Sequence, residues 1–76
     1  ETDILTVIDE ATPKWSLNKI NKIDLTILIL GTFEILHVED TPKKVVLNEM
    51  INLAKKFGSG ESNSFINGVL DTIANK

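Results

Sequence analysis

The sequence contains no cysteine and no arginine, and His37 is its only histidine. Without cysteine there are no disulfides, and a single histidine leaves no basis for a zinc site built from Cys and His. All eight basic residues are lysines and the net charge is −3, which argues against a general polyanion binder. Any contact with nucleic acid is therefore expected to be local or to depend on a partner.

The chain is also too short to form a large hydrophobic core. Its 76 residues make one domain or part of one, and chains of this size bury only about 60% of their unfolded surface. The longest apolar run, Leu25 to Gly31, is interrupted by Thr26 and is too short to span a membrane. No signal peptide is visible. Because the chain opens at Glu1 rather than at a methionine, we expect further sequence upstream.

Apolar residues recur at helical spacing and predict an all-α fold. The expected segments are a helix over 2–11, a short helical turn over 15–20, and helices over 21–37, 42–57 and about 61–75. The 21–37 segment is apolar nearly all round, which is typical of a central helix. Its Leu25–Leu30 run could instead be a buried strand, but the length of the segment favours a helix.

Several residues are expected to mark the helix ends. Thr12-Pro13 should break the first helix. Thr41 is expected as the N-cap of the 42–57 helix, with Pro42 at its first position, and Gly58 as its stop. The buried face of that helix is predicted to contain Val46, Met50, Leu53, Ala54 and Phe57.

The second half of the chain carries a series of motifs in fixed order. They are Pro42, Leu47-Asn48-Glu49, Leu53-Ala54-Lys55, Phe57-Gly58, Ser62 and the run Phe65-Ile66-Asn67-Gly68-Val69-Leu70-Asp71. Upstream, the matching positions are Trp15, Leu17, Ile20, Asp24, Ile27-Leu28 and Phe33-Glu34-Ile35. Over about residues 15–73 the chain resembles the C-terminal half of the NusB family of transcription antitermination factors.

The resemblance implies a NusB-like helical bundle, here a C-terminal sub-bundle of about four helices. Residues 1–76 would form a single domain, a fragment lacking the N-terminal half of the family. The implied function is non-catalytic: a cytoplasmic factor that pairs with the ribosomal protein NusE, binds boxA-type RNA and joins an RNA polymerase antitermination complex. It implies no cofactor, no metal and no membrane.

The resemblance also implies roles for individual residues. Phe65 matches a phenylalanine that stacks on RNA bases, although its place at the edge of the apolar arc also suits a core residue. Glu61 and Ser62 match residues beside the RNA, but from their place at a helix start we expect them to cap the last helix. Lys56 could contact an RNA phosphate. More simply, its positive charge could stabilise the C-terminal end of the 42–57 helix by interacting with the helix dipole. Asp24 matches an acid facing NusE, while an Asp at a helix start is favourable anyway.

The chain departs from the family pattern at two points. Arginines expected near Leu25 and at Ile29 are absent, so an internal ion pair is lost or is replaced by a lysine such as Lys43. The arginine-rich N-terminal half is also absent, so we expect weak RNA affinity and an exposed apolar surface that favours a homo-oligomer. Gly68 is expected to let a neighbouring helix approach closely, with Asn67 hydrogen-bonding at the crossing.

Two other functions stay open. RNA cytosine methyltransferases of the RsmB type carry a NusB-like domain ahead of a catalytic domain. A helical protein–protein module without an RNA role would suit the acidic charge and the lost arginines. No catalytic arrangement of residues is apparent in this sequence, so we do not expect an enzyme.

Overall fold

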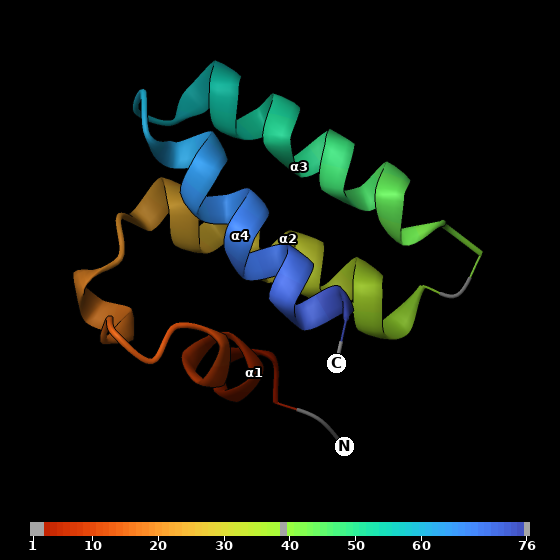
Figure 1. The fold of residues 1–76 in the computed structure, drawn as a ribbon, viewed down its shortest axis with the longest axis horizontal. Coiled ribbons are helices and arrows are strands. Elements are labelled where there is room, and N and C mark those ends of the chain that lie inside the picture. Colours follow the sequence, from red (N-terminus) through yellow and green to blue (C-terminus); the bar gives the residue numbers. More distant parts are fainter. Residues whose placement is uncertain (1–2, 39, 76) are drawn as a thin grey trace.

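The computed structural model describes residues 3–38 and 40–75, and these form only helices and their connections. The elements are α1 (Ile4–Ala11), a 3₁₀ turn (Leu17–Lys19), α2 (Lys22–His37), α3 (Lys43–Phe57) and α4 (Ser62–Ala74), as Figure 1 shows. The all-α prediction is confirmed, and Leu25–Leu30 is helical rather than a strand. Thr2, the expected start of the first helix, and Glu39 in the connection after α2 lie outside the described residues.

Helix α2 is central, as its composition predicted. It packs against α1, α3 and α4, while α3 and α4 also pack against each other and α1 rests on α2 and α4. Each helix contributes to one apolar core; the largest fully buried apolar side chains are Ile8, Leu28, Val46, Ile66 and Leu70. The core therefore joins all four helices into one bundle.

One stripe of α2 nevertheless remains uncovered. Ile23, Leu30 and Phe33 are each about half exposed, and their spacing of seven and three residues places them on one side of the helix. The helix is apolar all round, but only part of its circumference is buried. An exposed apolar stripe of this kind favours contact with another surface.

The helix ends follow local hydrogen bonding. The Asn21 carboxamide oxygen accepts a bond of 2.8 Å from the Ile23 backbone N–H at the start of α2. Thr12 ends α1 as expected, and its hydroxyl donates to the Ile8 carbonyl at 2.9 Å. The expected Thr41 cap is wrong by one residue: Pro42 is itself the N-cap of α3, with ψ of 141°, and Lys43 is the first helical residue.

The glycine that permits close helix packing is Gly31, not Gly68. A Cβ placed on Gly31 would lie 2.9 Å from both Leu70 Cδ1 and Met50 Cγ, so α3 and α4 both approach α2 at this point. A Cβ on Gly68 would meet no atom within 4 Å, and Asn67 beside it is exposed. The prediction of a packing role for Gly68 in this chain is therefore wrong.

Candidate binding hollow at the start of helix α4

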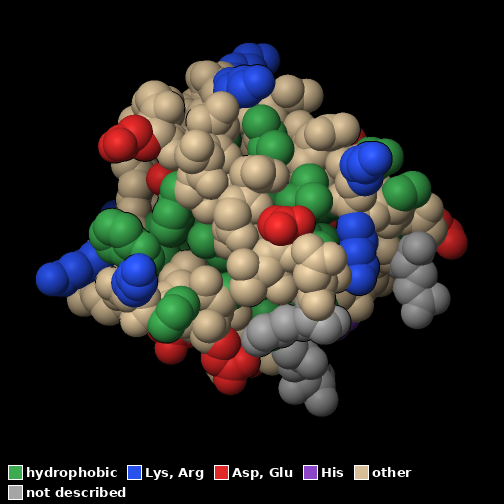
Figure 2. Space-filling view, in the orientation of Figure 1, with side chains coloured by type: hydrophobic (Ala, Val, Ile, Leu, Met, Phe, Trp, Pro, Cys, Tyr) green, Lys and Arg blue, Asp and Glu red, His purple; other side chains and the backbone are tan. Residues whose placement is uncertain are grey.

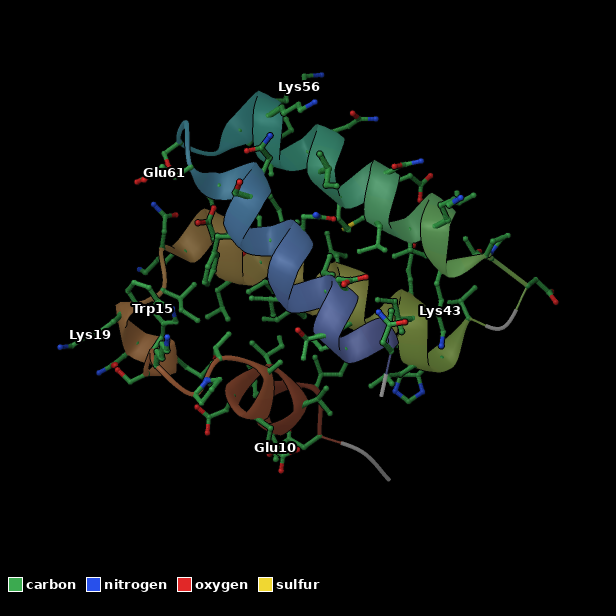
Figure 3. The ribbon with its side chains drawn as sticks, viewed as in Figure 1. Glu10, Trp15, Lys19, Lys43, Lys56 and Glu61 are labelled. Carbon is green, nitrogen blue, oxygen red and sulfur yellow. The ribbon has the colours of Figure 1, made fainter. Side chains whose placement is uncertain are left out.

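A hollow of about 390 Å³ lies where the α1–α2 connection and the start of α2 meet the loop before α4. We call it the α4 hollow; it is lined by Trp15, Lys19, Ile20, Asn21, Asp24, Ser59, Glu61, Ser62, Ser64 and Phe65. Four residues that the sequence singled out line it together: Phe65, Glu61, Ser62 and Asp24. Figure 3 shows Trp15, Lys19 and Glu61 at this end of the bundle.

Two aromatic rings form one wall of the hollow. Phe65 is half-buried and packs against the core, as expected of a residue at the edge of the apolar arc. Trp15 meets it edge to face, with ring centroids 6.0 Å apart and planes at 79°. Trp15 itself is 54% exposed. Much of its indole is free to contact a ligand.

A tight turn between α3 and α4 supports the other side of the hollow. The Ser62 hydroxyl is buried and accepts a bond of 2.9 Å from the Ser59 backbone N–H. Gly58, the C-cap of α3, has extended backbone with φ of −94°, so no left-handed conformation requires a glycine there. It is required for space: a Cβ on Gly58 would lie 2.6 Å from Ser62 Cβ and 2.8 Å from the Ala54 carbonyl oxygen.

Neither Glu61 nor Ser62 caps α4 with its side chain. Glu61 occupies the N-cap position without a side-chain cap hydrogen bond, and Ser62 is the first helical residue. The Ser62 hydroxyl instead bonds backwards to the turn. The expected capping role of these side chains is therefore wrong, and the Glu61 carboxylate is exposed at the rim of the hollow.

Asp24 contributes a buried carboxylate to the hollow. It lies in the first turn of α2, is 9% exposed, and its Oδ1 has no hydrogen-bond partner among the described residues. Glu34 Oε2 in the same helix is likewise buried without a partner in this part of the chain. Lys43 does not replace a lost ion pair here, because its Nζ donates to the Ala74 carbonyl at 2.8 Å.

Lys56 lies apart from the other predicted site residues. It does not line the hollow, and its Nζ stands 5.5 Å from the centroid of the Phe57 ring. Phe57 was expected on the buried face of α3 but is 56% exposed. In Figure 3, Lys56 points away from the bundle at the end of α3. Its position in the last turn of α3 suits the helix dipole, as predicted.

The charge of the α4 hollow is weakly negative. Its ionisable lining comprises Lys19, Asp24 and Glu61, one cation against two carboxylates. Figure 2 shows lysines and acids interspersed over the face in view, without a basic patch. Within the described residues, no three His, Cys, Asp or Glu side chains are grouped to hold a metal ion. No helix in the same ranges has the length and apolar character needed to cross a membrane.

A second, shallower depression was not predicted from the sequence. It measures about 370 Å³ and is almost wholly apolar; we call it the α2–α3 groove, and it is lined by Lys22, Ile23, Thr26, Ile27, Leu30, Leu53 and Phe57. The seven-residue spacing of Ile23 and Leu30 indicates that both lie on one face of α2. The groove could not be predicted from that spacing alone, because only the packing of α3 beside α2 brings Phe57 to them.

Comparison with known proteins identifies relatives over nearly the whole chain. The NusB family model matches residues 1–75, which extends the resemblance to α1. The transcription antitermination protein NusB of Finegoldia magna is 48% identical over 71 residues, 93% of this chain and 52% of the relative. The protein of the same name from Clostridium novyi is 53% identical over 68 residues, 90% of this chain and 51% of the relative.

The protein named NusB from Geotalea uraniireducens is 48% identical over 67 residues, 88% of this chain and 46% of the relative. The chain thus spans about half the length of the curated relatives it matches. The family match and the four-helix bundle agree with the motifs from Pro42 to Asp71. The chain belongs to the NusB family.

Proposed function

We propose that this chain acts in transcription antitermination as a non-catalytic, cytoplasmic RNA-binding subunit that pairs with NusE on boxA-type RNA. The relatives described above bear the antitermination name, which favours this role over that of an RsmB-type methyltransferase domain. The observation that carries the proposal is the α4 hollow. It gathers Phe65, Glu61 and Ser62, assigned to RNA, beside Asp24, assigned to the protein partner.

In this proposal each residue has a separate task. Phe65 stacks on an unpaired base, because single-stranded RNA is held largely by aromatic stacking. Glu61 meets sugar hydroxyls or base edges from the rim, while the buried Ser62 hydroxyl keeps the turn in shape. Lys56 contacts phosphate further along the strand. With few cations nearby, the chain needs NusE to hold RNA firmly.

Replacing Phe65 with alanine tests the RNA contact. Stacking on an aromatic side chain contributes about 1–3 kcal/mol per base, so we expect boxA affinity to fall by about 5–150-fold. The measurement is fluorescence anisotropy of labelled boxA RNA with and without NusE, against a scrambled RNA. The native chain should bind boxA only when NusE is present.

Matched variants separate stacking from damage to the fold. Phe65→Tyr keeps an aromatic ring and should retain most of the affinity. Phe33→Ala removes an exposed ring from α2 that does not line the hollow, and should leave RNA binding unchanged. The proposal would be contradicted if Phe65→Ala and Phe33→Ala lowered RNA affinity equally. It would also be contradicted if the chain with NusE bound boxA and scrambled RNA equally well. If the chain binds NusE but no RNA under any condition, its function would be that of a protein–protein interaction module.

We further propose that two copies of the chain associate through the α2–α3 groove, because this apolar surface is exposed in the bundle. Leu30→Glu puts a charge in its lining and should shift the sedimentation equilibrium toward the monomer. We expect an increase in the dimer dissociation constant of at least about tenfold, the effect of desolvating one unpaired charge. Thr72→Glu, on an exposed part of α4, is the control. A native chain that sediments as a monomer at high concentration would refute self-association.

A further inference from the structure

We propose that Asn67-Gly68 is a latent modification site, at which Asn67 deamidates to aspartate and isoaspartate when helix α4 opens. This inference goes beyond the proposed function and needs no RNA or protein partner. It concerns two residues without a packing role in the bundle. A Cβ on Gly68 would meet no atom within 4 Å, and both Asn67 and Gly68 are exposed.

The reaction needs only the chain itself and water. The backbone nitrogen of Gly68 attacks Cγ of Asn67, and the new C–N bond closes a succinimide ring. The bond from Cγ to the side-chain nitrogen breaks, and ammonia leaves with the proton that the Gly68 nitrogen gives up. Water then adds to either carbonyl of the ring and opens it. One opening gives aspartate, and the other gives isoaspartate, in which the main chain runs through Cγ.

Asn67 differs from the other asparagines in its neighbour and in its hydrogen bonding. It is the only asparagine in the sequence that precedes a glycine, which has no Cβ to hinder the attacking nitrogen. No hydrogen bond in the described part of the chain engages its carboxamide. By contrast, Asn21 Oδ1 accepts from the Ile23 N–H at 2.8 Å, and Asn75 Nδ2 donates to the Asp71 carbonyl at 2.8 Å. Asn67 is therefore the asparagine best placed to react.

Helix α4 holds the reaction back in the folded chain. Asn67 and Gly68 lie in the interior of this helix. There each backbone N–H belongs to the helical hydrogen-bond ladder, and the helical ψ keeps the nitrogen away from Cγ of the preceding side chain. The ring closes from extended or turn-like backbone, which these residues reach when α4 unwinds. The rate in native buffer is thus set by the fraction of molecules in which α4 is open.

Deamidation would make that opening hard to reverse. Isoaspartate adds a carbon atom to the main chain, so the residues before and after it no longer keep one helical register. Ile66 and Leu70, on either side of the site, are both fully buried in the shared core. The aspartate product keeps the main chain but places a carboxylate four residues before Asp71, and like charges at this spacing destabilise a helix. Both products therefore favour the open state.

The test follows deamidation of the full chain by peptide mapping and mass spectrometry. The chain is incubated at neutral pH in native buffer, in urea below the unfolding midpoint and in urea above it. Trypsin cleaves after Lys56 and gives a peptide that contains Asn63, Asn67 and Asn75, in which fragmentation identifies the modified residue. In the unfolded chain we expect Asn67 to react fastest. In the folded chain its rate should be far lower and should rise with urea in step with the open fraction.

Three substitutions separate the chemistry from its control by the helix. Gly68→Ala should slow the reaction in the unfolded chain, because the added methyl hinders the nitrogen. In native buffer it should slow it by about a further fivefold, because alanine favours the helix. Gly60→Ala, in the loop before α4, is the control and should leave the unfolded-chain rate unchanged. Leu70→Ala removes a core side chain and should speed the native-buffer rate about thirtyfold or more, up to the unfolded-chain limit.

Faster modification of another asparagine in the unfolded chain, or an unchanged rate in Gly68→Ala, would overturn the assignment of the site. Equal rates in native buffer and in urea would overturn the control by α4, and so would a native-buffer rate that Leu70→Ala leaves unchanged. A variant that fails to fold still reports its unfolded-chain rate. The comparison of Gly68→Ala with Gly60→Ala in urea therefore decides the chemistry whatever their stability.

Discussion

Leu70→Ala is expected to lower the free energy of unfolding by about 2–5 kcal/mol, the usual cost of truncating a buried leucine. Leu70 is fully buried in α4, and its methyl groups approach α2 at Gly31. A chain of this length is expected to have a total stability of about 4–11 kcal/mol, so the variant should lose a large share of it. Urea denaturation followed by circular dichroism measures the change.

The contact between Leu70 and Gly31 can be tested by a second substitution. A Cβ on Gly31 would lie 2.9 Å from Leu70 Cδ1 and 3.1 Å from Cδ2, so Gly31→Ala overpacks the native bundle. In the Leu70→Ala background those methyls are gone and only the contact with Met50 Cγ at 2.9 Å remains, so the added Cβ should destabilise the bundle less. The double-mutant cycle should therefore show a coupling of about 1 kcal/mol or more. Additive effects would contradict the packing described at Gly31.

Gly58→Ala is expected to destabilise the chain by about 1–3 kcal/mol, the cost of overpacking a site that cannot relax. Its Cβ would lie 2.6 Å from Ser62 Cβ and 2.8 Å from the Ala54 carbonyl oxygen. These atoms belong to the backbone or lie next to it, so a change of rotamer cannot move them away. The turn that bonds Ser59 to Ser62 should open, and the wall of the α4 hollow should shift with it.

Gly60→Ala, in the same loop, is the matched control. A Cβ on Gly60 would meet nothing within 4 Å, so alanine should be tolerated there or should stabilise slightly by restricting the unfolded chain. Thermal melts of the two variants give the comparison. If both variants lowered the melting temperature equally, the destabilisation would come from general stiffening of the loop rather than from lack of space at Gly58.

The sequence predicted the elements because the helical periods are long and their breaks are clear. The segment 21–37 is apolar nearly all round, so a helix in contact with several others was the natural expectation, and α2 contacts three. The gathering of Phe65, Glu61 and Asp24 could be anticipated only through the family resemblance. Asp24 lies more than thirty residues from the other two, and periodicity within one helix carries no information about contacts between helices.

The wrong predictions about the core and the hollow concern features that depend on how the helices pack against one another. Gly31 and Gly68 look alike as single glycines inside helical patterns, and only the placement of Leu70 and Met50 shows which one is crowded. Phe57 continues the apolar stripe of α3, yet the helix ends before anything covers it. The α4 hollow as a cavity was not foreseen, because it depends on how the α1–α2 connection lies beside the loop before α4.

The bond from Lys43 Nζ to the Ala74 carbonyl bears on the order in which the bundle loses structure. It joins the first residue of α3 to the last residue of α4, while the turn from Gly58 to Ser62 holds the opposite ends together. The α3–α4 hairpin is thus fastened at both ends and forms a cooperative unit of the kind that opens late in native-state exchange. Helix α1, at eight residues the shortest α-helix described, packs mainly on α2 and α4 and is the natural place for opening to begin.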